Sequence, residues 1–267
     1  MKTTPTELAD TFEQFKGQLK SYLLRMTASV PDTEDILQDT YLKAHTKLSS
    51  FKGEASLKTW VFAIASNLAK DFLRNKKRWP EQVTDICKTA AMSNPAFFQE
   101  AMQIRETSPQ GNFEIKEHIA FCFTCVGKSL PLEQQLALLL KEVYDFKVIE
   151  IAMIMDQNEA MVKYYLRTAR SKMIAIFDKR CSLINKEGIC HQCTELNGIF
   201  NPKQKIEEEL VKIEMVRKAA AVDKAHLFDL RMKILKEIDP FESGAAILQL
   251  HHLQHNKVVM DNYLKEN

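Results

Sequence analysis

Residues 148–167, VIEIAMIMDQNEAMVKYYLR, decide the fold of the second half of the chain. Small Ala152 is placed where two helices can cross closely. Asp156 falls at the turn, where the backbone becomes left-handed, a conformation that Asp tolerates better than most residues. Val162 and Leu166 then supply the apolar contacts of a second helix. The stretch therefore predicts a helix-turn-helix, with helices at 148–156 and 159–177.

The second helix of this motif has a basic outer face. Its exposed positions are expected to be Lys163, Tyr164, Arg167, Arg170 and Lys172. Such a face suits a helix that reads the major groove of DNA. A helical hairpin with a solvated face explains the apolar spacing equally well, so the basic residues carry the DNA-binding interpretation.

Charge is unevenly distributed, although the formal net charge is only +2. Residues 51–80 contain seven Lys or Arg against two acids, and residues 159–180 contain six against two. Residues 31–50, which precede both basic stretches, contain four acids against two Lys. Two basic patches and one acidic patch indicate a polyanion contacted twice and a different partner elsewhere. Solvated helix faces are the alternative explanation.

The composition favours an all-α protein. The 267 residues suffice for two or three small domains, and only 7 Gly and 8 Pro are present, which argues against a turn-rich β protein. No apolar run approaches the ~18–20 residues that span a bilayer, and the N-terminus lacks the apolar stretch of a signal peptide. We therefore expect a cytoplasmic protein with no membrane partner.

The periodicity divides the chain into four parts. Residues 7–79 read as one helical domain, in which Asp32 is expected to cap a helix and Leu57 to Phe72 form the strongest apolar stripe. Residues 80–112 read as a linker with short helical pieces, and 113–180 as a second domain that contains the helix-turn-helix. Residues 181–267 form a helical C-terminal extension.

Three stretches carry a family resemblance. DTEDILQDTY at 32–41 resembles region 2.2 of extracytoplasmic-function (ECF) sigma factors, and SLKTWVFAIASNLAKD at 56–71 resembles their regions 2.3 and 2.4. LPLEQQ at 130–135, LLLKEV at 138–143 and the helix-turn-helix resemble region 4. The modules match in the family's order. The resemblance implies a non-enzymatic sigma factor that directs core RNA polymerase to promoters and assists promoter opening.

The same resemblance assigns roles to particular positions. Asp35, Gln38 and Asp39 match a surface that docks on polymerase. The positions that match the surface facing the minus-10 element are Lys58, Asn67, Lys70 and Arg74, and Trp60 is a further candidate for DNA binding. Lys163 and Arg167 match the helix that reads the minus-35 element, and Tyr164 and Arg170 on its outer face are further candidates for DNA binding. Trp60 lies in the apolar stripe, so it is either a core residue or a DNA wedge. Core polymerase and promoter DNA are the expected partners, and an anti-sigma factor is a further candidate.

The reading helix departs from the family pattern. Tyr164-Tyr165 stand where the family usually has a small residue followed by Arg. The guanidinium that would bind guanine through two hydrogen bonds is therefore absent at this position. Ala160-Met161 replace the expected Gly-Thr before Val162. The target sequence of the helix therefore cannot be inferred from relatives.

Five of the six cysteines have a suggestive spacing. Cys122 and Cys125 form a CxxC before the helix-turn-helix, and Cys181, Cys190 and Cys193 follow it, with His191 between the last two. If the ends of the domain meet, four thiolates could hold zinc, and a softer set could favour copper(I). Redox sensing is a second possibility. Plain burial is a third, because Cys122 and Cys125 lie among phenylalanines. His251 and His255 are treated as surface residues.

Two other classes of protein remain open from the residues alone. One is a metal- or thiol-responsive helix-turn-helix regulator that never joins polymerase, and the other is a helical interaction scaffold. Copurification with core polymerase separates the first from a sigma factor, and a scaffold predicts no DNA affinity.

Overall fold

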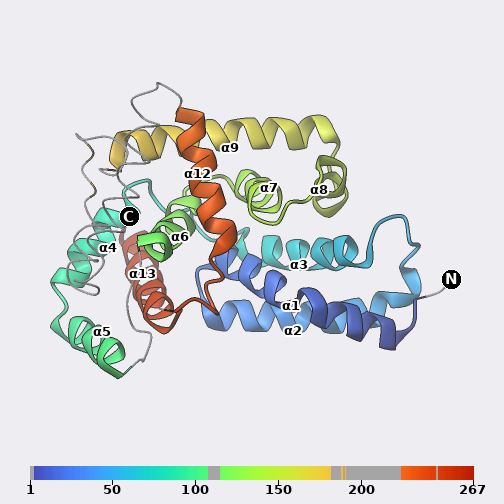
Figure 1. Ribbon diagram of the computed structural model, residues 1–267, viewed down its shortest axis with the longest axis horizontal. Helices are drawn as coiled ribbons and strands as arrows, with labels where there is room; N and C mark the ends of the chain where they lie inside the picture. Colours follow the sequence, from blue (N-terminus) through green and yellow to red (C-terminus); the bar gives the residue numbers. More distant parts are fainter. Residues whose placement is uncertain (1–2, 108–114, 182–187, 189, 191–223, 245) are drawn as a thin grey trace. The chain divides into compact units, whose positions relative to one another are not determined.

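The computed structural model describes residues 3–107, 115–181, 188, 190, 224–244 and 246–267 (Figure 1). Within these residues every regular element is a helix, apart from an isolated β-bridge between Cys181 and Cys190. The all-α prediction is thereby confirmed for the described part. The helices form two compact units, one of Met1–Lys77 with Pro131–Ala169 and one of Arg78–Leu130 with Arg170–Asn267.

The side chains of Thr4, Ser29 and Ser56 cap the first three α-helices of the first unit. The helices of this unit are α1 (Pro5–Thr27), α2 (Val30–Lys47), the short 3-10 helix η1 (Leu48–Ser50), α3 (Leu57–Leu73), α7 (Leu132–Glu142), α8 (Val148–Met155) and the start of α9 (Glu159–Arg180). Ser29 caps α2 by accepting a hydrogen bond from the backbone N–H of Asp32 at 3.4 Å. The prediction that Asp32 is the cap is wrong, because Val30 and Pro31 already belong to the first turn.

The periodic apolar faces of α1, α2 and α3 pack against one another as the sequence predicts. The buried side chains on α1 include Phe12, Phe15, Leu19, Tyr22 and Met26. The hydroxyl of Tyr22 shares a buried hydrogen bond with Ser66 of α3 at 2.8 Å, so the polar tip of this large side chain is satisfied. Burial raises the pKa of Tyr22 far above its usual range.

The helix-turn-helix forms as predicted. Asp156 ends α8 in the left-handed conformation, with φ 52° and ψ 52°. Asn158 then accepts a hydrogen bond from the backbone N–H of Met161 at 2.9 Å and thereby caps the first turn of α9. Val162 and Leu166 are buried and secure the second helix of the motif.

The loop between α7 and α8, directly before the helix-turn-helix, packs on α1 and α3 through aromatic side chains. We call Tyr22, Phe62, Tyr144 and Phe146 the aromatic cluster. The ring centroids of Phe62 and Phe146 lie 4.8 Å apart, and those of Tyr22 and Tyr144 lie 5.6 Å apart in an edge-to-face pair. Such pairs contribute about 0.5–1.5 kcal/mol each beyond the area they bury. Segments far apart in sequence therefore share one core.

Hydrogen bonds fix the same packing in register. The side-chain amide of Gln135 donates to the carbonyl oxygen of Arg25 at 3.0 Å, and both groups are buried. The hydroxyl of Thr59 on α3 donates to Glu150 on α8 at 3.2 Å. These polar contacts would be left unsatisfied if the helices slid past one another, so they specify one arrangement.

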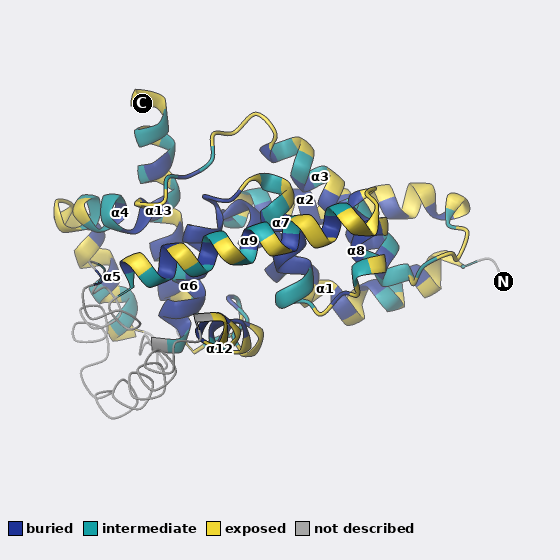
Figure 2. Cartoon of the chain, turned by 90° about the horizontal axis from the view of Figure 1, so that it is seen from above, coloured by how far each residue is buried: buried dark blue, intermediate teal, exposed yellow. Residues whose placement is uncertain are grey.

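The second unit is built around a nearly fully buried helix, α6 (Ile115–Gly127), which is dark blue along most of its length in Figure 2. Around it lie α4 (Val83–Met92), α5 (Pro95–Thr107), α12 (Lys224–Glu237), α13 (Ala246–Glu266) and the end of α9. Helix α13 contacts α4, α5 and α6, and α12 contacts α6. The segment 80–112, predicted as a linker with short helical pieces, contains α4 and α5.

Replacing Phe146 with Ala should uncouple the helix-turn-helix from α3. The change removes a buried ring from the aromatic cluster and should lower the free energy of unfolding by about 3–5 kcal/mol. Amide hydrogen exchange should show the largest loss of protection in α7 and α8. Met153→Ala is the matched control, because Met153 is 47% exposed on α8 and its loss should change stability by only ~0.5 kcal/mol. Equal losses of protection in α1 and α8 would contradict the prediction.

Acid should destabilise the second unit through two buried histidines. Burial, with the neighbouring imidazole, lowers the pKa of His118 to about 3, and burial lowers that of His252 to about 4. The unfolded chain therefore binds more protons than the native one below about pH 6.5, and stability decreases as pH falls from there toward 4. Urea unfolding between pH 7.5 and 4.5 measures the slope. His118→Gln should flatten it, whereas His226→Gln, at an exposed position, should not.

Candidate functional site

The acidic-polar surface of α2 is exposed as the sequence predicts. Asp35, Gln38 and Asp39 occupy positions i, i+3 and i+4 and are all exposed, whereas Ile36 and Leu37 between them are buried. Because the helix is fixed by its buried face, the three polar side chains have no structural task in the core. They form a surface that a partner could contact without disturbing the fold.

The predicted DNA-facing residues of α3 divide into two groups. Asn67 and Arg74 are exposed and Lys70 is half-buried, and all three follow one side of the helix at helical spacing. Arg74 is weakly restrained by an exposed ion pair with Asp71 at 3.3 Å. Such a pair contributes little to stability and can be exchanged for another anion. This group stays available for a polyanion.

Lys58 lies apart from that group. Its ammonium nitrogen donates to Gln18 at 2.7 Å and stands 5.3 Å from the ring centroid of Phe146 in the aromatic cluster. Burial is the main cause that lowers its pKa, and the carboxylates of Glu150 and Asp145 oppose the shift. The same lysine thus belongs both to the predicted DNA surface and to the packing of the helix-turn-helix on α3.

Trp60 is half-buried and packs against Phe51, with ring centroids 5.2 Å apart. One face of the indole therefore has a partner inside the fold, while part of the ring reaches solvent. This placement fits either of the two roles predicted from the sequence.

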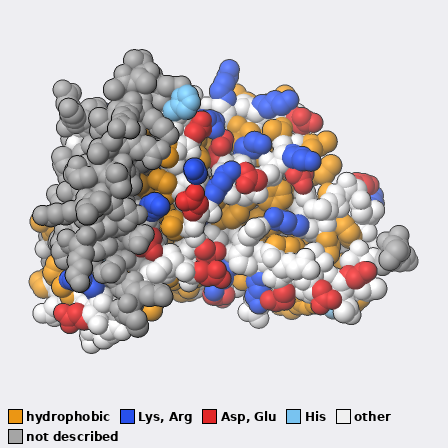
Figure 3. Space-filling model, viewed as in Figure 1, with side chains coloured by type: hydrophobic (Ala, Val, Ile, Leu, Met, Phe, Trp, Pro, Cys, Tyr) orange, Lys and Arg blue, Asp and Glu red, His pale blue; other side chains and the backbone are white. Residues whose placement is uncertain are grey.

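The outer face of α9 is exposed near its start. Lys163 and Arg167 are exposed, and Tyr164 is 48% exposed between them. Lys163 makes an exposed ion pair with Glu159 at 3.6 Å, one turn earlier. Figure 3 shows several Lys and Arg side chains, mixed with acidic ones, on the face over α7 to α9. The first two turns of the helix therefore present cations to solvent.

Arg170 has a different environment from the other predicted DNA-binding residues of α9. Its guanidinium pairs with Asp229 of α12 at 2.6 Å and lies 4.8 Å from the ring centroid of Phe228. The C-terminal extension thus contacts the predicted reading helix. Sequence reasoning missed Asp229 and Phe228, because no local pattern links them to a residue 59 positions away.

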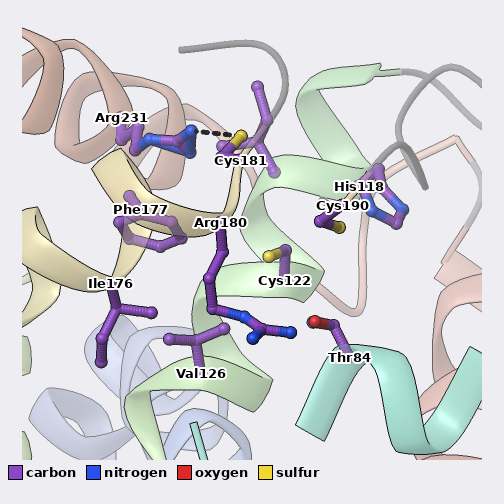
Figure 4. A pocket seen from close by; sticks show the side chains of 11 residues that line it. Thr84, His118, Cys122, Val126, Ile176, Phe177, Arg180, Cys181, Cys190 and Arg231 are labelled. Atoms are coloured by element: carbon purple, nitrogen blue, oxygen red, sulfur yellow. Dashed lines mark hydrogen bonds between the residues drawn. The ribbon is translucent and has the colours of Figure 1, made fainter. Parts of the chain in front are cut away.

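The cysteines on either side of the helix-turn-helix meet at one pocket in the second unit. Cys122 of α6, Cys181 and Cys190 line it together with His118, Arg180 and Arg231 (Figure 4). Arg231 of α12 donates a hydrogen bond to the sulfur of Cys181 at 3.0 Å. The prediction that the two sets of cysteines approach each other is borne out for these three.

Cys125 does not line this pocket. Its sulfur accepts a hydrogen bond from the side-chain amide of Asn256 at 3.7 Å, and burial raises its pKa to about 12. Burial likewise raises the pKa of Cys122 well above its usual range. In the described part of the chain no cluster of three or more His, Cys, Asp or Glu side chains has the arrangement of a metal site. Cys193 and His191 lie outside the described residues, so zinc or copper binding stays a prediction.

Among the described helices, none is both long enough and apolar enough to cross a membrane.

Comparison with known proteins finds several RNA polymerase sigma factors that are similar to this chain. Residues 11–79 match the model of Sigma-70 region 2. The chain is 28% identical over 175 residues to the ECF RNA polymerase sigma factor SigG of Mycobacterium tuberculosis, an alignment that spans 60% of this chain but only 46% of SigG. It is 25% identical over 166 residues to the RNA polymerase sigma factor YlaC of Bacillus subtilis, spanning 62% of this chain and 89% of YlaC.

A further relative is the ECF RNA polymerase sigma-E factor of Salmonella typhimurium, with 30% identity over 139 residues, 52% of this chain and 70% of that protein. Among solved structures, the sigma factor RpoE of Bartonella quintana in complex with the anti-sigma factor NepR gives a TM-score of 0.43 at 16% identity, over 63% of this chain and 95% of that one. This structural likeness is too low to carry a conclusion. The sequence match to most of sigma-E, with region 2 recognised at 11–79, shows that the chain belongs to the ECF family of RNA polymerase sigma factors.

Proposed function

We propose that this chain binds core RNA polymerase and promoter DNA together, and that it directs transcription initiation without catalysing a reaction of its own. The observation that carries the proposal is the 30% identity to a sigma-E factor over 70% of that protein's length. The exposed surfaces of α2, α3 and α9 agree with it, because each presents side chains that the fold itself does not need. The cytoplasm, where polymerase and DNA are found, is the proposed compartment.

The polymerase contact is assigned to α2. Asp35, Gln38 and Asp39 offer carboxylates and an amide on one rigid, solvent-exposed face. A partner surface with Lys or Arg side chains would complement them, and complementary charge favours rapid and specific docking. An acidic face also repels DNA, so it separates the polymerase contact from the basic surfaces.

The DNA contacts are assigned to two helices. Asn67, Lys70 and Arg74 on α3 offer cations and an amide for the backbone and bases of a melted strand at the minus-10 element. On α9, Lys163 offers a cation, Tyr164 an aromatic ring and Arg167 a bidentate guanidinium for the major groove of the minus-35 element. The Tyr164-Tyr165 pair replaces the guanine-binding Arg of relatives, so we expect a different upstream sequence preference.

The family assignment favours this function over a regulator that never joins polymerase. A sigma factor and such a regulator would both bind DNA through α9, but only a sigma factor needs the α2 surface and a second DNA surface on α3. Binding of core polymerase is therefore the experiment that tests the proposal. An anti-sigma factor would be a further partner of the same surfaces.

Replacing both Gln38 and Asp39 with Ala should weaken core polymerase binding at least tenfold. The two side chains are exposed, so the thermal midpoint should hardly move. Copurification and a titration of fluorescent protein with core polymerase measure the change. Glu13→Ala on α1, an exposed carboxylate outside the α2 face, is the control. Undiminished binding by the double variant would rule out docking through this face.

Substitutions in the two DNA surfaces should impair different steps of transcription initiation. Lys163→Ala with Arg167→Ala should weaken binding of holoenzyme to the upstream element, and Lys70→Ala with Arg74→Ala should reduce promoter opening. Each lost phosphate contact should lower the salt slope of binding by about 1. Gel shifts and permanganate footprints report the two steps.

Lys179→Ala, at an exposed position near the end of α9, is the control for both pairs. Normal permanganate reactivity with Lys70 and Arg74 replaced would remove the α3 surface from the proposal, and normal gel shifts with Lys163 and Arg167 replaced would remove the α9 surface.

A further inference from the structure

Cys181 and Cys190 are placed for a reversible disulfide. Their backbones pair in an isolated parallel β-bridge, in which the backbone N–H of Cys190 donates to the carbonyl oxygen of Arg180 at 2.8 Å. Bridged strands lie about 4.8 Å apart. At that general spacing, the α-carbons of two bridged cysteines lie within the range of about 4.4–6.8 Å that disulfides require. Both residues are present as thiols.

Arg231 of α12 contacts the sulfur of Cys181, and this contact connects the thiol to the C-terminal extension. Arg231 is only 2% exposed, and its guanidinium stacks 4.2 Å from the ring centroid of Phe177 on α9 and donates to the sulfur of Cys181 at 3.0 Å. Its Nε has no hydrogen-bond partner among the described residues. A buried cation depends on each acceptor that it has. The thiol is therefore one of the groups that hold α12 against α9.

The same helix holds a predicted DNA-binding residue. Asp229, two residues before Arg231, pairs with Arg170 at 2.6 Å, and the neighbouring Phe228 packs under its guanidinium. While α12 is docked, Arg170 cannot also bind a phosphate through the atoms that contact Asp229. A change at Cys181 can thus reach the reading helix through one short segment of α12.

We propose that Cys181 and Cys190 form a thiol switch that peroxides oxidise and cellular dithiols reduce, and that oxidation releases α12 from α9. In the first step the sulfur of one cysteine attacks the peroxide oxygen, giving a sulfenic acid and, from hydrogen peroxide, one water. The second thiol then displaces hydroxide from the sulfenic sulfur, and with its proton this leaves as a second water. Two thiols and one peroxide give one disulfide and two waters.

The disulfide removes the acceptor of Arg231. Once the sulfur of Cys181 is bonded to that of Cys190, its position is set by the new bond and no longer by the hydrogen bond from Arg231. Helix α12 then loses a contact at its centre, and Asp229 separates from Arg170. The part of the inference that concerns DNA rests on the proposed function. The oxidation and the release of α12 do not.

The other described cysteines provide internal controls. Cys87 and Cys125 are buried on either side of Asn256, at 3.9 and 3.7 Å from its backbone oxygen and side-chain nitrogen. Burial raises the pKa of both thiols, which leaves them protonated and poorly nucleophilic. Cys122 shares the pocket and is the one described thiol that could compete for Cys181 or Cys190.

The test begins with the full-length protein, purified under reducing conditions and treated with hydrogen peroxide. Differential alkylation and peptide mapping should find a bond between Cys181 and Cys190 that dithiothreitol reverses. Cys87→Ser should behave like the wild type, and Cys190→Ser should form no bond at Cys181. A bond from Cys122 instead, irreversible oxidation without a crosslink, or a tightly held metal ion that keeps the thiols unreactive would each overturn the switch.

Hydrogen exchange then measures the release of α12 without any DNA. Oxidation should raise exchange in α12 about tenfold, which corresponds to about 1.4 kcal/mol of lost docking. Cys181→Ala, which deletes the acceptor, should raise it without oxidant, whereas Cys181→Ser, which keeps an acceptor, should not. Unchanged exchange in the oxidised protein would overturn the coupling. If α12 is released but affinity for upstream DNA is unchanged, the switch stands and the DNA role of Arg170 fails.

Discussion

The packing of Phe62 and Tyr22 against Phe146 and Tyr144 is the contact on which the first unit depends. Without it, α1 to α3 would form one small three-helix domain, and the helix-turn-helix would lack part of its core. A bundle of this size buries a small share of its surface, so an added aromatic layer changes its stability substantially. The hydrogen bonds from Gln135 and Thr59 work only because this layer brings the helices within reach.

The local features of the fold could be read from the sequence, and the long-range ones could not. The apolar stripes predicted the helices, and Asp156 marked the left-handed turn, because both depend on neighbouring residues. The aromatic cluster was missed, since a tyrosine or phenylalanine has the same local pattern whichever helix it faces. The Asp32 cap was misplaced because Ser29 and Asp32 are both good caps, and the start of α2 at Val30 decided between them.

The candidate site shows the same division. Helical spacing sufficed to place Asp35, Gln38 and Asp39 on one exposed face, and Lys163 with Arg167 on another. It could not foresee that Lys58 packs near Phe146 or that Arg170 pairs with Asp229. Nor could it show that Cys125 contacts Asn256, whereas Cys122, one helical turn earlier, lines the pocket with Cys181 and Cys190. Each of these outcomes depends on a partner more than 50 positions away.

For the function proposed above, the closed packing of α8 on α3 also sets a thermodynamic condition on promoter recognition. A unit of little more than 100 residues has a radius of gyration of about 13 Å. The minus-10 and minus-35 elements lie about 25 base pairs, or ~85 Å, apart on B-DNA. A chain that reads both at once must first separate α3 from α8, so only the open fraction of molecules is competent. The apparent affinity for DNA is reduced by that fraction, which means tenfold for each ~1.4 kcal/mol by which the closed state is more stable than the open one. Polymerase would restore the affinity by binding the open state preferentially.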